Sequence, residues 1–253
     1  MWFTDQLGGA AVAFTDATEG NLAAHTGEDP AEVAAHRRAL EVELGLADGS
    51  LRYMHQVHGT DVVTVASHGD GSRFTALEAP VADAAISADG TPLAVLTADC
   101  LPVIFVAERP GAGIPLLAVA HAGRRGLLDG VLQNTVGALR GRGATTLTAW
   151  IGPAICGACY EVPEDMRAES ARVLPGIDTE TSWHSPGLDL PGAARRVLEE
   201  LRVRVADPGS VRSDWCTLEH TELYSYRRDK TTSRLAGVVW VPSAFEPAGK
   251  ETP

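Results

Sequence analysis

Residues 93–120 read LAVLTADCLPVIFVAERPGAGIPLLAVA and hold three short apolar runs, at 93–97, 103–106 and 116–120. Asp, Pro and Gly separate the runs, which are rich in Val, Ile and Leu. Short apolar runs bounded by such turn residues are typical of buried strands. The stretch therefore predicts a β-sheet at the centre of the fold, with loops at its edge that hold polar side chains in place.

Outward from this stretch, helices and strands interleave. Helical spacing of apolar residues, with Asp29-Pro30 as the first cap, predicts helices at 28–44, 127–140, 163–173 and 190–201. Further β-rich runs stand at 51–54, 61–66, 84–87, 146–151, 203–206 and 237–241. The order lacks the strict βαβ rhythm of a doubly wound sheet. We therefore expect an α/β (mixed α+β) fold, a layered sandwich of mixed β-sheets flanked by helices. It should form a single domain over residues 1–245, with a disordered tail at 246–253.

The composition narrows the range of partners. The 253 residues include 33 acidic and 21 basic side chains, a formal net charge of −12, which is poorly suited to nucleic acid. No apolar stretch approaches the roughly 20 residues that span a bilayer. The first ten residues lack the basic flank and apolar core of a signal peptide. Four cysteines are too few for a disulfide scaffold. We expect a cytoplasmic monomer or small homo-oligomer that acts on a small molecule and binds neither nucleic acid nor membranes.

Three segments carry a potential metal ligand where a predicted strand meets a loop. These ligands are His58 in HQVHG, Cys100 in TADCLP and His121 in VAHAG. Two imidazoles and one thiolate suit Zn²⁺, and three protein ligands leave a fourth position open, as in catalytic zinc sites. Any one of these residues alone is more often a packed, hydrogen-bonded side chain than a ligand. Their separations of 42 and 21 residues leave both interpretations open.

Two acidic residues are candidates for supporting such a site. Asp99 adjoins Cys100, so it is a candidate to orient a metal-bound His through a hydrogen bond or to move a proton in catalysis. A turn-capping role is equally compatible with its place at a strand end. Asp83 is the second candidate, either for proton transfer or for substrate binding.

A second cysteine-bearing segment reads IGPAICGACYE, residues 151–161. A C-x-x-C pair such as Cys156 and Cys159 serves as a redox pair or as half of a zinc site. Because a second C-x-x-C is absent and the pair follows Gly-Pro in a loop, we favour a tight turn with small packed thiols. Tyr160, beside the pair, is a candidate to line a pocket.

Two arginine doublets stand near these motifs. Arg124 and Arg125 precede the helix predicted from residue 127, and helix N-termini attract anions. Arg227 and Arg228 follow two tyrosines in YSYRRD. Guanidinium groups bind phosphate or carboxylate through two parallel hydrogen bonds. The doublets therefore indicate an anion site, although a solvated surface charge run remains the alternative.

Six motifs then appear in an order that resembles one family: HQVHG, ADAAIS, TADCLP, HAGRRG, the segment 151–162 and SYRRD. The chain, from Phe3 to about Val241, resembles the laccase-domain or polyphenol oxidase family, also described as purine nucleoside phosphorylases and as a peptidoglycan-editing factor. The resemblance implies a single-domain α/β-type sandwich, similar in outline to cysteine-hydrolase toxins. It also implies zinc on His58, Cys100 and His121, and so selects His58 over His55.

The chain departs from the family pattern at three places. Arg124 replaces the usual Trp of H-A-G-W-R-G, Gln6 replaces the usual Arg of T-D-R-x-G-G, and His36 replaces an Asn in the first helix. The first two changes alter the charge near the pocket that the resemblance implies. The three metal ligands are all present.

The resemblance implies a zinc-dependent purine nucleoside enzyme that cleaves adenosine, inosine or methylthioadenosine with phosphate and also deaminates adenosine. Phosphorolysis needs an anion site, for which Arg125 and Arg227 are the candidates. It also needs groups that hold the purine, for which Gln56 and Tyr160 are the candidates.

Three other functions are compatible with parts of the sequence. The alternative is an amide hydrolase acting on a peptidoglycan precursor, with zinc-activated water or a Cys100–His121 pair as nucleophile; a Cys bound to zinc is no longer a free nucleophile, so these two mechanisms compete. Copper-dependent polyphenol oxidation is disfavoured because such enzymes need many His ligands, often as His-x-His, and this chain has eight His and no His-x-His. A non-catalytic metal-binding protein is disfavoured by the open coordination position.

Overall fold

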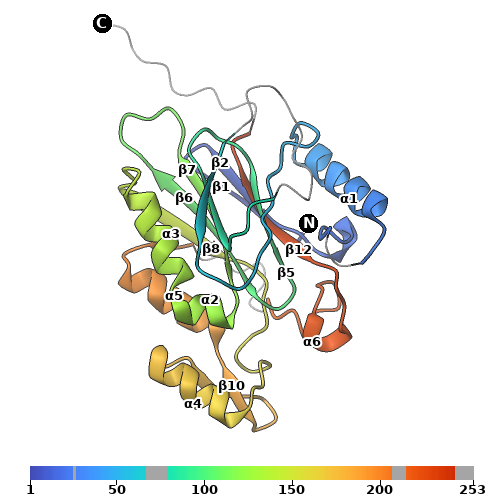
Figure 1. The fold of residues 1–253 in the computed structure, drawn as a ribbon, viewed down its shortest axis with the longest axis vertical. Helices are drawn as coiled ribbons and strands as arrows, with labels where there is room; N and C mark the ends of the chain where they lie inside the picture. The colour runs from blue at the N-terminus through green and yellow to red at the C-terminus, as the bar shows by residue number, and fades with distance from the viewer. Residues whose placement is uncertain (25–26, 67–78, 207–214, 243–253) are drawn as a thin grey trace, which may run out of the picture.

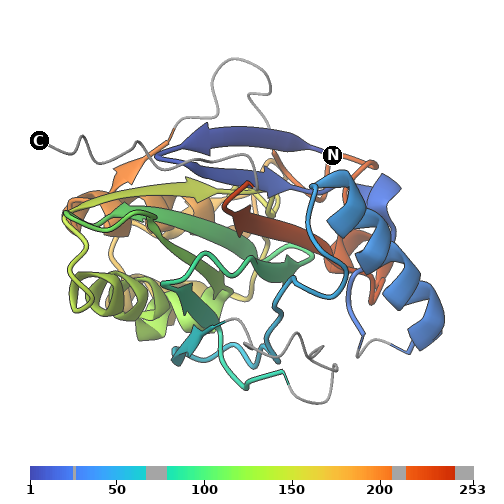
Figure 2. The same cartoon turned by 90° about the horizontal axis from the view of Figure 1, so that it is seen from above.

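The computed structural model describes residues 1–24, 27–66, 79–206 and 215–242. Two β-sheets stack face to face, and helices cover their outer faces (Figures 1 and 2). This arrangement confirms the predicted α/β class with mixed sheets flanked by helices. The likeness to cysteine-hydrolase toxins stays a prediction, and the tail predicted at 246–253 lies outside the described residues.

The larger sheet is mixed. Its strands are β3 (Val62–Val65), β4 (Ala84–Ser87), β6 (Leu101–Glu108), β7 (Leu116–Ala122), β8 (Thr146–Ile151) and β11 (Arg204–Val205). They lie in the order β11-β8-β6-β7-β4-β3. The two outermost pairs are parallel and the inner pairs are antiparallel. The central strands β6 and β7 therefore come from the stretch that predicted the sheet.

The smaller sheet is antiparallel throughout. Its strands are β1 (Phe3–Leu7), β2 (Ala10–Phe14), β5 (Leu93–Thr97) and β12 (Leu235–Trp240), in the order β1-β2-β12-β5. Since β5 belongs to this sheet and β6 to the larger one, residues 98–100 carry the chain from one sheet to the other.

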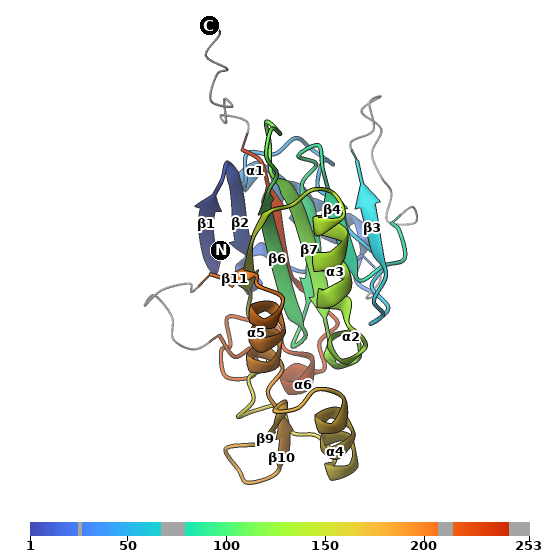
Figure 3. The same cartoon turned by 90° about the vertical axis from the view of Figure 1, so that its left-hand side faces the viewer.

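Helices close both outer faces. Helix α1 (Pro30–Glu43) lies on the side of the smaller sheet, and α2 (Arg124–Asp129), α3 (Val131–Arg140) and α5 (Leu190–Glu200) lie on the side of the larger one (Figures 1 and 3). Helix α4 (Glu164–Val173) and the ribbon of β9 (Asp178–Glu180) with β10 (Pro186–Leu188) extend from one end. The short helices η1 (Ala17–Glu19) and α6 (Tyr226–Asp229) complete the elements. No helix in the described ranges is long and apolar enough to cross a membrane.

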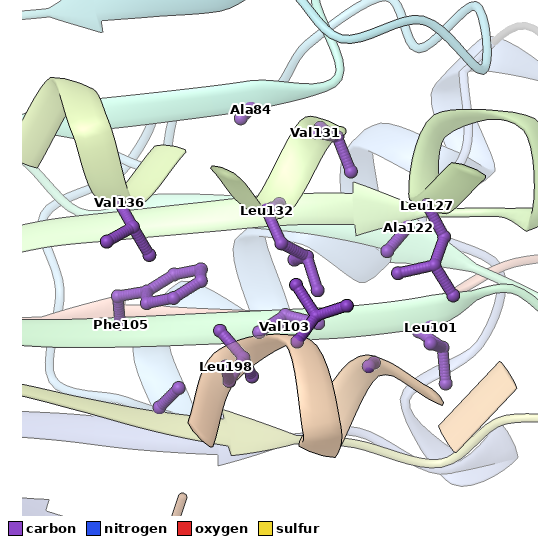
Figure 4. Close-up of a cluster of buried hydrophobic side chains, with 14 of the residues drawn as sticks. Ala84, Leu101, Val103, Phe105, Ala122, Leu127, Val131, Leu132, Val136 and Leu198 are labelled. Carbon is purple, nitrogen blue, oxygen red and sulfur yellow. The ribbon is translucent and has the colours of Figure 1, made fainter. Parts of the chain in front are cut away.

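The central strands are apolar along their whole length because both of their faces are buried. In β6, Ile104 and Val106 pack between the two sheets, while Val103 and Phe105 pack against the helices (Figure 4). Leu132 of α3 and Leu198 of α5 belong to that second cluster. Burying one such large side chain contributes roughly 1.5–3 kcal/mol. The larger sheet, which carries part of the candidate site, is therefore packed on both faces.

Two sequence predictions of secondary structure were wrong. Residues 51–54 form no strand; Arg52 makes only an isolated bridge to Leu93. The helix predicted at 127–140 is two helices, because Gly130 adopts a left-handed φ of 97° that ends α2 and begins α3. The hairpin of β1 and β2 went unpredicted, although Gly8 and Gly9, with φ of 58° and 82°, form the kind of turn that two-residue hairpins favour.

Candidate metal centre

His58, Cys100 and His121 converge in space. One potential ligand atom from each lies within 4.8 Å of the others. The distance between Cys100 Sγ and His58 Nε2 is 3.8 Å. Tetrahedral zinc, with sulfur at 2.3 Å and nitrogen at about 2.0 Å, would separate two such atoms by about 3.5 Å. The pair of Cys100 and His58 is therefore within a few tenths of an ångström of the separation that one ion requires, and His121 lies close enough to complete the set.

Each ligand is placed by a different part of the fold. Cys100 follows Asp99 on the crossover between the sheets, where Asp99 takes a φ of 86°. His121 belongs to β7, opposite Pro102 of β6, so the crossover and the strand end lie side by side. His58 comes from the loop before β3, with a φ of 61°. His121 is buried, Cys100 half-buried and His58 exposed, so the site opens on the His58 side.

Gly123 provides the space in which the ligands meet. A Cβ at this position would lie 2.8 Å from His58 Cδ2 and 3.0 Å from Cys100 Sγ. Both distances are shorter than an ordinary van der Waals contact of 3.4–4 Å. The φ of Gly123 is −68°, a value that any residue can adopt. The glycine of HAGRRG is therefore required by the close approach of the ligands and not by its backbone angle.

Asp83 fixes the orientation of two ligands from behind. Its Oδ1 accepts hydrogen bonds from His121 Nδ1, at 2.8 Å, and from His58 N, at 2.9 Å. Its Oδ2 accepts from the backbone N–H groups of Val57 and Gly59, at 3.1 and 2.6 Å. With the proton of His121 held on Nδ1, Nε2 is left to face the site.

The charge of this buried group follows from its contacts. The side chain of Asp83 is fully buried. Burial alone would raise the pKa of Asp83, but the hydrogen bonds from His121 and Gly59 outweigh it and lower the pKa to about 2. Asp83 is therefore a carboxylate at neutral pH.

Cys100 and His121 form a mutually stabilising pair. Burial would raise the pKa of Cys100, but the charge of His121 and its hydrogen bond lower it to about 6. Burial would lower the pKa of His121, but Cys100 and Asp83 raise it to about 9. Without metal, the pair is thus a thiolate beside an imidazolium at neutral pH. Because a ligating imidazole nitrogen must be unprotonated, His121 Nε2 would have to lose its proton to hold a metal ion.

The three ligands face a cavity of about 560 Å³. Four basic side chains line it, from Arg124, Arg227, Lys230 and Arg234, beside one acidic residue, Asp99. The remaining lining is made by Gln56, Leu96, Thr97, Ala98, Ile155, Tyr160, Leu190 and Tyr226. An acidic protein thus concentrates positive charge around one cavity, an arrangement that attracts anions.

The predicted anion-binding residues are only partly in place. Arg227 lines the cavity, 5.1 Å from the centre of the Tyr160 ring, and donates to the carbonyl of Glu161. Arg125 is exposed and outside the lining, so anion binding by Arg125 stays a prediction; Arg124, one residue earlier on α2, lines the cavity. The family departure at Arg124 therefore adds a positive charge to the cavity itself, whereas Gln6 is exposed on β1 and outside the lining.

The other predicted site residues have defined partners. Asp83 is buried behind His121 and outside the lining, so substrate binding by its carboxylate stays a prediction. Asp99 lines the cavity, and its two oxygens accept hydrogen bonds from Thr217 Oγ1 and Arg227 N. The hydrogen bond that orients His121 comes from Asp83 and not from Asp99. Gln56 also lines the cavity, with both ends of its amide bound to the Leu96 backbone.

Sequence reasoning missed Lys230 and Arg234 because neither stands in a motif with a strand-to-loop signal. Only the fold of residues 226–235, which leads from α6 into β12, brings them to the cavity. Arg228, the neighbour of Arg227, faces away and donates to the carbonyls of Thr217, His220 and Leu223.

Comparisons with known proteins show which proteins the chain resembles. Residues 1–242 match the family model described as multi-copper polyphenol oxidoreductase laccase. The chain is 46% identical over 244 residues to purine nucleoside phosphorylase ORF3 of Streptomyces griseus, covering 94% of this chain and 93% of that protein. It is 36% identical over 225 residues to purine nucleoside phosphorylase YfiH of Escherichia coli K12, covering 87% and 86%.

Solved structures share the fold. Protein NMB0706 of Neisseria meningitidis superposes with a TM-score of 0.76 at 30% identity, covering 94% of this chain and 98% of that one. YlmD of Geobacillus stearothermophilus superposes with a TM-score of 0.73 at 30% identity, covering 92% and 91%.

Proposed function

The chain belongs to the multi-copper polyphenol oxidoreductase laccase family, and from that premise we propose that it is a zinc-dependent purine nucleoside phosphorylase. One observation carries the proposal: an open three-ligand metal site faces a cavity lined by four basic side chains. The names of its relatives, purine nucleoside phosphorylases at 46% and 36% identity, support the same reaction.

The basic side chains supply the anion site that phosphorolysis requires. Phosphate forms a bond to C1′ of the ribose while the bond from C1′ to the purine nitrogen breaks and its electron pair leaves with the base. Arg124, Arg227, Lys230 and Arg234 are placed to hold that phosphate and to offset its charge during the attack. Asp99 contributes by position, because it accepts from the backbone N–H of Arg227 and so anchors α6 at the cavity.

The departing purine needs contacts and a hydrogen-bond donor. Tyr160 lines the cavity, and burial raises the pKa of its hydroxyl, so it stays protonated and able to donate at neutral pH. Its ring and that of Tyr226 offer faces for the base to pack on. Gln56 acts indirectly, since its amide is bound to the backbone of Leu96 and orients the cavity wall.

The donor set favours zinc over copper. His58, Cys100 and His121 match the mixture of imidazole and thiolate that suits zinc with an open position. A blue-copper site would add a weak axial ligand such as Met, and no Met is among the residues lining the cavity in the described part of the chain. When bound, zinc would supply Lewis-acid polarisation of a substrate atom in the cavity.

A second candidate, an amide hydrolase acting on a peptidoglycan precursor, is favoured by one observation. Cys100 and His121 form a thiolate–imidazolium pair, which is the activated state of a cysteine nucleophile. Asp83 holds the imidazole as the third member of such a triad would. Zinc on Cys100 would block this nucleophile, so the metal content of the active protein separates the two candidates.

A product assay tests the proposal. The full chain, purified with its metal, is incubated with adenosine and inorganic phosphate, and the products are separated by chromatography. We expect equal amounts of adenine and ribose 1-phosphate, formed only when phosphate is present and lost in Cys100→Ala together with the zinc ion of the His58–Cys100–His121 site. Inosine without adenine would indicate deamination alone and would overturn the proposal. So would cleavage of a muramyl-amino-acid conjugate by metal-free protein while adenosine stays intact.

A further inference from the structure

A second group of potential metal ligands lies beside the cavity. It consists of Cys156, Cys159, Cys216 and Glu219, whose ligand atoms all lie within 4.8 Å of one another. None of the four lines the cavity. Cys159 and Cys216 are buried, Cys156 is half-buried and Glu219 is exposed. Three of the four cysteines of the chain thus gather at one point, and none of them forms a disulfide.

Backbone hydrogen bonds hold the two contributing segments in register. The N–H groups of Cys159 and Tyr160 both donate to the carbonyl of Cys156, at 3.0 and 2.9 Å, and this turn brings the two thiols of the C-x-x-C together. A parallel bridge joins Ala154 to Cys216. The third thiol, 60 residues away, is therefore fixed opposite the first two before any ion binds.

Contacts within the group already resemble those around a bound ion. The Sγ of Cys216 accepts the backbone N–H of Cys156 at 3.4 Å, a contact that stabilises a thiolate. The thiol of Cys159 donates to Glu219 Oε1 at 3.4 Å, so the carboxylate reaches into the sulfur cluster. Sulfur ligands of tetrahedral zinc, at 2.3 Å from the ion, lie about 3.8 Å apart, so atoms that already lie within 4.8 Å of one another need to approach by at most about 1 Å.

We propose that Cys156, Cys159, Cys216 and Glu219 bind a second zinc ion, as a closed four-ligand site with a structural role. Four protein ligands fill the tetrahedral shell, in contrast to the open triad of the cavity. Three thiolates and one carboxylate carry the same formal charge as a four-cysteine zinc site. A redox role fits less well, because one disulfide among three thiols would leave a third sulfur and a carboxylate packed against it.

The ion would fasten two segments that shape the cavity. Ile155 and Tyr160, beside the C-x-x-C, line the cavity. Thr217, next to Cys216, donates to Asp99, which in turn holds the N–H of Arg227. The second ion would therefore fix the positions of the aromatic and basic sides of the cavity without touching substrate.

Metal counting with reciprocal variants tests this inference independently of any activity. We expect about two zinc ions per chain in the wild type and about one in both Cys216→Ser and Cys100→Ser, measured by mass spectrometry of the metal. Loss of the zinc only in Cys100→Ser, with a wild-type content of one, would overturn the second site and leave the first intact. If the wild type holds two zinc ions and each variant loses one of them, both sites are supported.

Cobalt substitution keeps the test decisive if Cys216→Ser folds poorly. In Cys100→Ser, bound Co²⁺ should retain a strong sulfur-to-cobalt charge-transfer absorption from three thiolates, and Glu219→Gln should weaken binding of the ion. Glu222→Gln, an exposed acidic neighbour on the same segment, is the matched control and should leave the spectrum unchanged. Absence of this absorption in Cys100→Ser, or a disulfide between Cys156 and Cys159 in freshly purified protein, would contradict the proposal.

Discussion

Replacing Asp83 with Asn removes one charge from beneath the candidate metal site and leaves the size of the side chain almost unchanged. The Asp83 carboxylate accepts four hydrogen bonds, two on each oxygen. An amide keeps one accepting oxygen, which His121 and the His58 N–H can still use. Its NH₂ group then faces the N–H groups of Val57 and Gly59, so donors oppose donors inside the protein.

The size of the effect follows from the ionisation of the carboxyl group. A fall of the pKa of Asp83 from 3.8 to about 2 corresponds to roughly 2 kcal/mol of folding stability at neutral pH. Because the folded-state pKa is the lower one, this contribution is complete above about pH 4 and disappears as the pH falls toward 2. The opposed donors in the Asn variant add to the cost, so we expect a loss of about 2–3 kcal/mol.

Two measurements check this expectation. Denaturant unfolding of the metal-free protein at pH 7 gives the loss of stability, and competition with a chelator gives the zinc affinity. The affinity should fall by about 10–100-fold, as for other residues that orient metal-bound histidines. Asp61→Asn is the matched control: its side chain is exposed, and its free energy of unfolding should change by less than about 0.5 kcal/mol. An unfolding midpoint and a zinc affinity in Asp83→Asn equal to those of the control would refute the reasoning.

Three further predictions address the cavity and the ligands. Arg124→Ala should raise the KM for phosphate about tenfold or more, whereas Arg125→Ala, exposed and outside the lining, should leave it unchanged; equal effects in steady-state kinetics would contradict the assignment. Gly123→Ala should abolish zinc binding at the His58–Cys100–His121 site, because its Cβ would meet two of the three ligand side chains. In contrast, Gly137→Ala, with open space around a Cβ, should keep the metal content of the wild type. In metal-free protein, alkylation of Cys100, followed by peptide mass spectrometry, should rise with a midpoint near pH 6 and be suppressed by zinc; a midpoint near pH 9 would show that His121 does not stabilise the thiolate.

Three strands were predicted from the sequence with the bounds that the structure shows. The strands at 84–87, 93–97 and 146–151 agree with β4, β5 and β8 because apolar side chains are required wherever a strand is buried. The sequence also selected His58, Cys100 and His121, which the structure brings together, although only the resemblance distinguished His58 from His55. Local patterns do not report which distant residues meet, so the convergence of the triad needed the structure.

What the sequence did not predict is the direction in which side chains point and which residues far apart in the sequence lie together. Successive residues of a helix point about 100° apart, and the sequence does not specify the rotation of α2, so it does not tell which of Arg124 and Arg125 faces the cavity. Asp99 was the candidate to orient a metal-bound histidine, and Asp83 was a candidate for proton transfer or substrate binding; only the pairing of β4 with β7 places Asp83 beside His121. Cys216 carried no local signal, because its two cysteine partners lie about 60 residues earlier in the chain.

The crossover that carries Cys100 from one sheet to the other has a consequence for the order of folding. The triad ligands are separated by 42 and 21 residues, so an unfolded chain holds no preformed chelate and must close two long loops to make one. Cys100 meets His121 only after β6 has paired with β7, and meets His58 only after the loop before β3 has docked on Asp83. The ion is therefore acquired late, by a chain that has already folded, and zinc added at the start of refolding should not accelerate the folding of this protein.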